Sequence, residues 1–187
     1  MISFDVAWKQ ADAVLLRALN AVLPDDIALQ DLRQQPGFHP RFDALSRVYV
    51  YTIIHAPQRQ PLWQSYAWHI WGDLDSAALH ATAQLLVGEH DFATFGSPPK
   101  GTNTVRHVLQ SSWQALDEPF GQRLRYTVEG NAFLEHMVRR IVGTQIDVAR
   151  GQMTLKQFVA AFAAADLSRA GTIAPPQGLV LEQVRYP

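Results

Sequence analysis

Residues 105–151 read VRHVLQSSWQALDEPFGQRLRYTVEGNAFLEHMVRRIVGTQIDVARG, and the architecture that we expect follows from them. The segments VRHVLQSSWQAL (105–116) and QRLRYTVEG (122–130) have the length and the aromatic and β-branched content of strands. DEPFG (117–121) lies between them and carries turn residues, which predicts a hairpin. Apolar residues then recur at helical spacing over 131–151, which predicts a helix directly after the hairpin.

The predicted helix separates apolar from polar side chains. Its apolar side comprises Phe133, Leu134, Met137, Val138, Ile141, Val142, Val148 and Ala149. Its other side comprises His136, Arg139, Arg140, Asp147 and Arg150, with Gly143 among them. Taken alone, this pattern is typical of a surface helix with a solvated charged face. The alternative is a helix beside a cleft, with arginines that bind a phosphate or a carboxylate through their planar guanidinium groups.

The flanking sequence extends this β-β-α unit into a larger one. Further strands are predicted over 46–54, near 66–71 and over 179–186, and further helices over 73–92 and 154–166. Asp75 or Ser76 is the expected N-cap of the first of these helices, and Gly88 is its expected stop. The resulting order, β-α-β-β-α-β, predicts a ferredoxin-like split βαβ fold of the α+β class, with an antiparallel sheet and helices on one face.

The first 45 residues predict a shorter unit of the same kind. A strand is expected over 1–6, a helix over 7–23 and a second strand over 26–32. We interpret residues 1–45 as the remnant of an N-terminal α/β half without its opening strand and helix. Residues 46–187 are then the C-terminal ferredoxin-like half.

Composition narrows the classes of function. The chain has 187 residues, of which 48% are apolar, and it contains no cysteine, so disulfides and thiolate chemistry are excluded. No apolar run approaches the roughly 18 residues that span a bilayer. We see no signal peptide and expect a cytoplasmic protein without a membrane partner. With a formal charge of −1, a nucleic-acid-binding protein would need its basic residues clustered on one surface.

The predicted strand over 46–54 has two different faces. One carries Arg47, Tyr49, Tyr51 and Ile53, and the other carries Val48, Val50, Thr52 and Ile54. Val48, Val50 and Ile54 are expected to face the core. An arginine in line with two tyrosines is typical of a platform on which unpaired bases stack. An ordinary half-buried strand, with tyrosines packed under a loop, fits the pattern equally well.

Two loops add further polar groups. PGFHPRF (36–42) places Phe38, His39 and Arg41 before this strand, and SPPKGTNTVRH (97–107) contributes Lys100, Arg106 and His107 as candidate phosphate contacts. GEHD (88–91) is expected to be a structural turn. The seven histidines follow no metal-ligand spacing, and no nucleotide-binding glycine motif occurs, so neither a metal nor a cofactor is expected.

Five segments together resemble the tRNA pseudouridine synthase A family. In order they are ALNAVLPDDIAL, FHPRFDALSRVYVY, LLVGEHDFATF, NAFLEHMVRRIVGT and APPQGLVLEQVRY, and the resemblance covers residues 2–186. It implies two ferredoxin-like halves with a cleft between them and a homodimer. It also implies an isomerase that converts uridines in the tRNA anticodon stem-loop to pseudouridine without a cofactor, through an aspartate that attacks the flipped-out nucleotide.

The resemblance assigns roles to individual residues. Tyr49 matches the tyrosine that stacks on the target base, and Arg139 matches the arginine that pairs with the catalytic aspartate. Contacts to RNA are expected from Arg41, Arg47, Lys100, Arg106, His136 and Arg140.

The sequence also departs from the family. The catalytic aspartate of the family lies in a G-R-T-D-A-G loop, which does not occur here, and ISFDV (2–6) matches the strand after that loop. We therefore expect the chain as given to be inactive, and Asp5 is not expected to replace the nucleophile. Smaller departures are Glu135, Val48 and Gly96, which suggest altered RNA contacts or relaxed constraint.

Two other interpretations stay open. The chain could be a non-catalytic RNA-binding or dimerisation module derived from the enzyme, as loss of the aspartate would predict. It could also be an unrelated ferredoxin-like enzyme that uses its histidines, although their scatter weighs against this.

Overall fold

The computed structural model describes all residues from 1 to 187. The chain forms two compact units, one of residues 1–44 together with Pro187 and the other of residues 45–186. None of the helices combines the length and the apolar character that crossing a bilayer requires.

The larger unit is built on four strands and two helices in ferredoxin-like order. These are β1 (Ser46–His55), α2 (Ser76–Gln84), β4 (Val105–Glu118), β5 (Gly121–Gly130), α3 (Met137–Ala149) and β6 (Leu179–Arg185). The strands lie side by side in the order β6-β1-β5-β4, and all neighbours among them are antiparallel. The predicted α+β class and split βαβ order are confirmed.

Two short strands extend the sheet beyond this framework. β2 (Trp68–Ile70) pairs with the end of β1, and β3 (Gly88–Asp91) pairs with the start of β4. The β1–β2 pair is parallel, so the six-stranded sheet is mixed where an antiparallel one was expected. The prediction of a turn over 88–91 is also wrong. α2 ends at Gln84, and Gly88, at a φ of 112°, begins a strand instead of stopping the helix.

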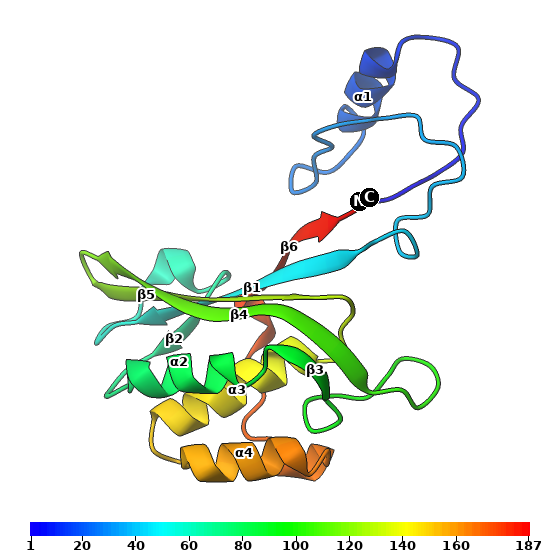
Figure 1. The fold of residues 1–187 in the computed structure, drawn as a ribbon. Helices are drawn as coiled ribbons and strands as arrows, with labels where there is room; N and C mark the ends of the chain where they lie inside the picture. Colours follow the sequence, from blue (N-terminus) through cyan, green and yellow to red (C-terminus); the bar gives the residue numbers. More distant parts are fainter. The chain divides into compact units, whose positions relative to one another are not determined.

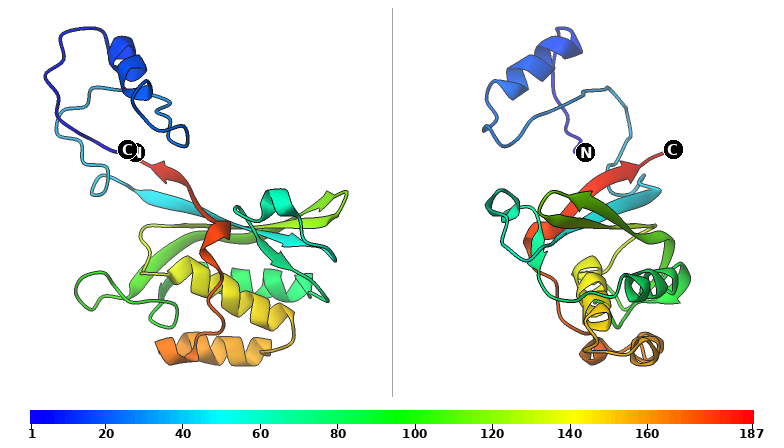
Figure 2. Two further views of the ribbon diagram at one scale, coloured as in Figure 1. Left: turned by 180° about the vertical axis from the view of Figure 1, so that it is seen from behind. Right: turned by 90° about the vertical axis from the view of Figure 1, so that its left-hand side faces the viewer.

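The helices cover one face of the sheet. α2 and α3 lie next to the sheet, and α4 (Leu155–Ala163) lies beyond them (Figures 1 and 2). Asp75 caps α2 through its carboxylate, as predicted, and Thr154 caps α4. The main core lies between sheet and helices; it includes Tyr51, Ile53, Leu124, Tyr126, Val128, Met137 and Ile141.

The helix predicted over 131–151 begins only at Met137. Residue 136 adopts a left-handed conformation, with a φ of 58°, and Glu135 forms an isolated bridge with Ser97. Moreover, every residue of α3 from Ile141 to Ala149 is buried, including Asp147. The charged side is therefore only partly solvated, with His136 exposed and Arg139, Arg140 and Arg150 partly buried. The segment 170–178 covers the polar side: Thr172 N donates to Asp147 Oδ2 at 2.6 Å.

Tyr51 belongs to the core and not to an exposed platform. It is 0% exposed, and its hydroxyl donates to Pro175 O at 2.6 Å. The tyrosine face of β1 is the face that the helices cover, whereas Val48 and Val50 are buried on the opposite face. Alternation separates the two faces of a strand but does not indicate which face the helices cover.

The smaller unit contains one helix, α1 (Asp12–Asn20), within the predicted range 7–23. Asn20 holds the following chain because its side chain exchanges two hydrogen bonds with the backbone of Leu29, at 3.0 and 2.8 Å. The strands predicted over 1–6 and 26–32 are not formed. No neighbouring strand pairs with them, and Ile2, Phe4 and Val6 are exposed despite their strand-like alternation.

Candidate nucleic-acid interface at one end of the sheet

Three segments that carry predicted site residues meet at one end of the sheet. The start of β1 lies beside the end of β5, with Arg47 opposite Gly130 and Tyr49 opposite Val128. The start of β4 lies on the other side of β5, with Val108 also opposite Gly130. The fold therefore brings Arg47, Tyr49, the 105–108 segment and the 131–136 segment to the same edge of the molecule.

Asn131 ties these segments together. Arg47 Nη1 donates to Asn131 O at 2.6 Å. Asn131 N donates to His107 O at 3.1 Å, and His107 N donates to Asn131 Oδ1 at 3.0 Å. The guanidinium group of Arg47 is thus held in place by a residue whose own side chain is fixed to β4. Asn131 precedes α3, although its helical spacing in the sequence predicted a place within the helix.

Tyr49 is partly exposed and packs against Phe133. The two rings meet edge to face, with centroids 5.0 Å apart and planes at 80°. Gly130 leaves room for this contact, because a Cβ there would lie 3.2 Å from the Phe133 ring. The ring of Tyr49 is thereby oriented while part of it stays accessible. Phe133 was expected on a helix and was not recognised as its support.

Arg139 lies in the first turn of α3, against the segment that precedes β6. Its Nε donates to Ala174 O at 2.7 Å. Its two Nη groups have no hydrogen-bond partner, are not sealed from solvent and form no ion pair with any carboxylate. Two parallel N–H groups in this geometry can bind a carboxylate or a phosphate side-on.

Tyr51 lies close enough to Arg139 for the charge to act on it. Burial raises the pKa of the Tyr51 hydroxyl well above its ordinary value, and the positive charge of Arg139 opposes that rise. The phenol therefore stays neutral and remains a hydrogen-bond donor to Pro175. Arg139 and Tyr51 thus donate to neighbouring carbonyl groups of one segment. Arg139 donates to Ala174, and Tyr51 donates to Pro175.

His136 stands at the start of α3 in a conformation that residues other than glycine rarely adopt. Its Nε2 lies 3.7 Å from Glu135 Oε1, and both side chains are exposed. Glu135 N donates to Ser97 O at 3.0 Å, which fixes the preceding residue. A Cβ on Gly96 would meet the Glu135 carbonyl oxygen, so the close packing of these two segments requires glycine at this position.

The remaining predicted contacts differ in how firmly they are held. Lys100 is exposed in the 97–104 loop. Arg106 Nη1 donates to Asn103 O at 3.1 Å and to Val105 O, and burial lowers the pKa of its guanidinium group. Part of Arg106 therefore supports its own loop. Arg140 is partly buried on α3, next to Arg139.

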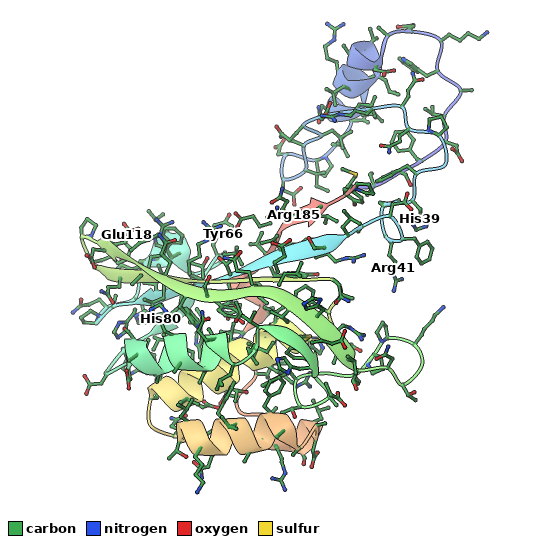
Figure 3. All side chains as sticks on the ribbon, viewed as in Figure 1. His39, Arg41, Tyr66, His80, Glu118 and Arg185 are labelled. Carbon is green, nitrogen blue, oxygen red and sulfur yellow. The ribbon has the colours of Figure 1, made fainter.

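Arg41 belongs to the smaller unit, in a turn that His39 organises (Figure 3). His39 Nδ1 accepts from the backbone N–H groups of Arg41 and Phe42, each at 3.2 Å, and His39 N donates to Asp43 Oδ2 at 2.8 Å. His39 thus has a structural role, and its turn presents Arg41. Across the chain, no three His, Asp or Glu side chains gather closely enough to hold a metal ion.

Sequence comparisons identify the family. A profile of the tRNA pseudouridine synthase family matches residues 82–187. The chain is 40% identical to tRNA pseudouridine synthase A of Geotalea uraniireducens over 185 residues, which is 96% of this chain and 75% of that protein. It is 44% identical to tRNA pseudouridine synthase A of Chloroflexus aurantiacus (91% and 62% of the two chains). It is 35% identical to that of Geobacillus sp. (100% and 74%).

The chain belongs to the tRNA pseudouridine synthase family. It spans 62–75% of the length of the three relatives named above.

Proposed function

We propose that these 187 residues form the RNA-binding and carboxylate-orienting part of a tRNA pseudouridine synthase. The observation that supports this best is the position of Arg139. Its side chain is anchored through Nε, its Nη groups carry no carboxylate, and its charge acts on Tyr51 of β1, two residues along the strand from Tyr49. A cation held in this way favours the ionised, nucleophilic form of an aspartate that approaches it.

In this proposal Tyr49 stacks on the target base, and basic side chains bind the RNA backbone. The backbone contacts come from Arg47, Lys100, Arg106, His136 and Arg140 on the larger unit and from Arg41 on the smaller one. The substrate is the anticodon arm of tRNA, and the protein acts in the cytoplasm as a homodimer. No residue of this chain needs a metal or a cofactor for these roles.

The nucleophile is the part of the mechanism that these residues do not supply. They contain no G-R-T-D-A-G sequence, and no carboxylate forms an ion pair with Arg139. Asp5 lies in the smaller unit and is exposed. We therefore propose that the 187 residues alone bind tRNA without forming pseudouridine, since nucleophilic catalysis requires a positioned nucleophile.

The test is carbodiimide mapping of pseudouridine in an unmodified tRNA transcript. It compares the chain as given with a chain extended at its N-terminus by the family segment that carries G-R-T-D-A-G. We expect modification only with the extended chain, and an Asp→Asn change in the added loop should abolish it without weakening tRNA binding. Modification by the chain as given would contradict the proposal. Binding without turnover in the extended chain would favour the non-catalytic module.

A further inference from the structure

A concave surface lies towards the other end of β1. It is an open hollow of about 850 Å³ lined by residues of the 54–71 segment and by Gln177. Ile54 and Ala67 are its buried apolar members, and Trp63, His69 and Trp71 are its aromatic ones. Ile54, the residue of β1 that lines the hollow, is five residues along the strand from Tyr49 and seven from Arg47. At roughly 3.3 Å per residue, the hollow therefore lies about 17 Å from Tyr49 and about 23 Å from Arg47 along β1.

The segment around this hollow is held by hydrogen bonds. Ala56 N donates to Ile70 O at 3.1 Å, and His69 Nε2 lies 2.9 Å from Ala56 O. Ala67 N donates to Trp63 O at 2.9 Å, and the guanidinium carbon of Arg123 lies 5.4 Å from the centre of the Trp63 ring. The hollow is therefore formed before any ligand arrives, which lowers the entropic cost of binding.

Two aromatic side chains beside the hollow are left in water. Trp71 is 63% exposed and Tyr66 is 68% exposed. The backbone that carries Trp71 is nevertheless anchored, because Arg150 Nη2 donates to Trp71 O at 3.0 Å and His55 Nε2 lies 2.8 Å from Gly72 O. Figure 3 shows Tyr66 on the sheet face opposite to α2, which carries His80. An exposed indole on a fixed backbone offers a flat apolar face for stacking.

The polar lining has a single sign of charge. Of the 17 acidic residues in the chain, none lines the hollow, and Arg59 is its one permanently charged member. Four glutamines, at 58, 60, 64 and 177, supply amide donors and acceptors. Aromatic faces, amides and one guanidinium group match the three parts of a nucleotide: its ring, its hydrogen-bonding edge and its phosphate.

We propose that this hollow, here called the Trp71 pocket (Arg59, Trp63, His69, Trp71 and the four glutamines), binds an unpaired nucleotide of RNA. The nucleotide is a different one from the target at Tyr49, given the separation along β1. Its base stacks on Trp71, its edge meets the glutamine amides, and its phosphate pairs with Arg59. The pocket would make a second contact to the substrate RNA, so this inference rests on the proposed function.

The pocket is tested with 5′-phosphorylated pentauridylate, a probe too short to form a hairpin. Ultraviolet cross-linking followed by peptide mapping should place the probe on the peptide that contains Trp71. Trp71→Ala should weaken the affinity for the probe, measured by tryptophan fluorescence, about 5- to 160-fold, the range expected for one stacked base. Trp71→Phe should restore most of the affinity, and Arg169→Gln, an exposed arginine outside the pocket, should change nothing. All variants should unfold at the same temperature as the parent.

A full-length tRNA transcript is the second probe and separates the two proposals. If Tyr49→Ala weakens tRNA binding and Trp71→Ala does not, the pocket inference is wrong and the proposed function stands. If pentauridylate cross-links to Trp71 while tRNA does not bind, the pocket inference stands and the proposed function is wrong. If Trp71→Ala changes only the sedimentation coefficient, the surface is an interface between protein chains, and the inference is wrong.

Discussion

Arg139 and Ala174 exchange two hydrogen bonds: Arg139 Nε donates to Ala174 O at 2.7 Å, and Ala174 N donates to Arg139 O at 3.1 Å. The pair joins the first turn of α3 to the segment that precedes β6, and Tyr51 holds the next carbonyl of that segment. The orientation of the arginine proposed to receive the catalytic carboxylate thus depends on residues far away in the sequence.

Replacing Gly143 by alanine tests this dependence. A Cβ at Gly143 would collide with the carbonyl oxygen of Thr172, so the 170–178 segment that covers α3 would have to move away from the helix. We expect a loss of unfolding free energy of about 1–3 kcal/mol, as for other overpacked sites. In the extended chain, turnover should fall by more than this loss of folded protein explains. Thermal unfolding and pseudouridine formation would be measured on the same samples.

Gly101→Ala is the matched control for Gly143→Ala. Nothing lies within 4 Å of a Cβ at Gly101, which has a φ of +71°. Only backbone strain is then expected, at a cost of about 1–2 kcal/mol. Equal effects of both variants on turnover would show that the 170–178 segment does not orient Arg139.

Tyr49→Ala should impair the reaction of the extended chain more than its folding. The side chain is partly exposed and contacts Phe133, whereas the core beneath it is built by residues such as Tyr51 and Val128. Loss of one stacked base should weaken RNA binding by about 1–3 kcal/mol. Tritium release from labelled tRNA and the melting temperature would be compared. A melting temperature that collapsed along with activity would identify Tyr49 as a core residue.

Stability should decline in alkaline solution because of Tyr51 and Tyr126. Burial raises the pKa of both hydroxyls above the ordinary value of 10.0. In the unfolded chain they ionise from about pH 10 upwards, whereas in the folded chain they stay protonated, so stability present below pH 10 is lost as the pH rises further. Urea unfolding at pH 8, 10 and 11 measures this decline.

Tyr51→Phe separates the contribution of one hydroxyl. At pH 8 the variant should lose about 1 kcal/mol, because the Pro175 carbonyl loses its donor. Its stability should then fall less steeply above pH 10 than that of the parent, since one titrating group is gone. Identical slopes would mean that Tyr51 is not the buried, neutral phenol described above.

Binding of an anticodon-arm hairpin should weaken steeply with salt. The proposed contacts from five or six basic side chains would release counterions, which predicts a slope of log K against log salt concentration between about −3.5 and −5.4. Fluorescence anisotropy from 50 to 200 mM KCl measures the slope. An affinity that stays constant over this range would remove these side chains from the RNA interface.

The sequence predicted the framework of the larger unit well, and for a physical reason. The alternation of residues 46–54, the 117–121 turn and the cap at Asp75 are local signals, and the structure contains the corresponding strand, hairpin and helix. Tyr51 shows where local signals fail. Its alternation with Val50 was visible, but which face the helices cover is decided by contacts with residues far away in the sequence.

The candidate site was foreseen in its residue types but not in its supports. Resemblance to the family selected Arg139 and Tyr49, whereas the sequence predicted Phe133 only as part of the apolar side of a helix and gave no role to Ala174. The spacing of apolar residues over 131–136 continues the helical spacing of α3, so the sequence did not indicate the left-handed conformation of His136. In the same way, the strand pattern of Ile2, Phe4 and Val6 could not reveal that no neighbouring strand pairs with it.

The most direct test of the central claim is the effect of Arg139→Gln on the extended chain. Glutamine can keep an N–H donor near the position of Nε, which contacts Ala174 O, but it lacks the charged Nη groups that would stabilise the nucleophilic carboxylate. We predict that pseudouridine formation in a single-turnover assay falls at least 100-fold, the order seen when one preorganised electrostatic group is removed, while tRNA affinity changes less than about fivefold. Turnover equal to that of the parent would contradict the role proposed for Arg139.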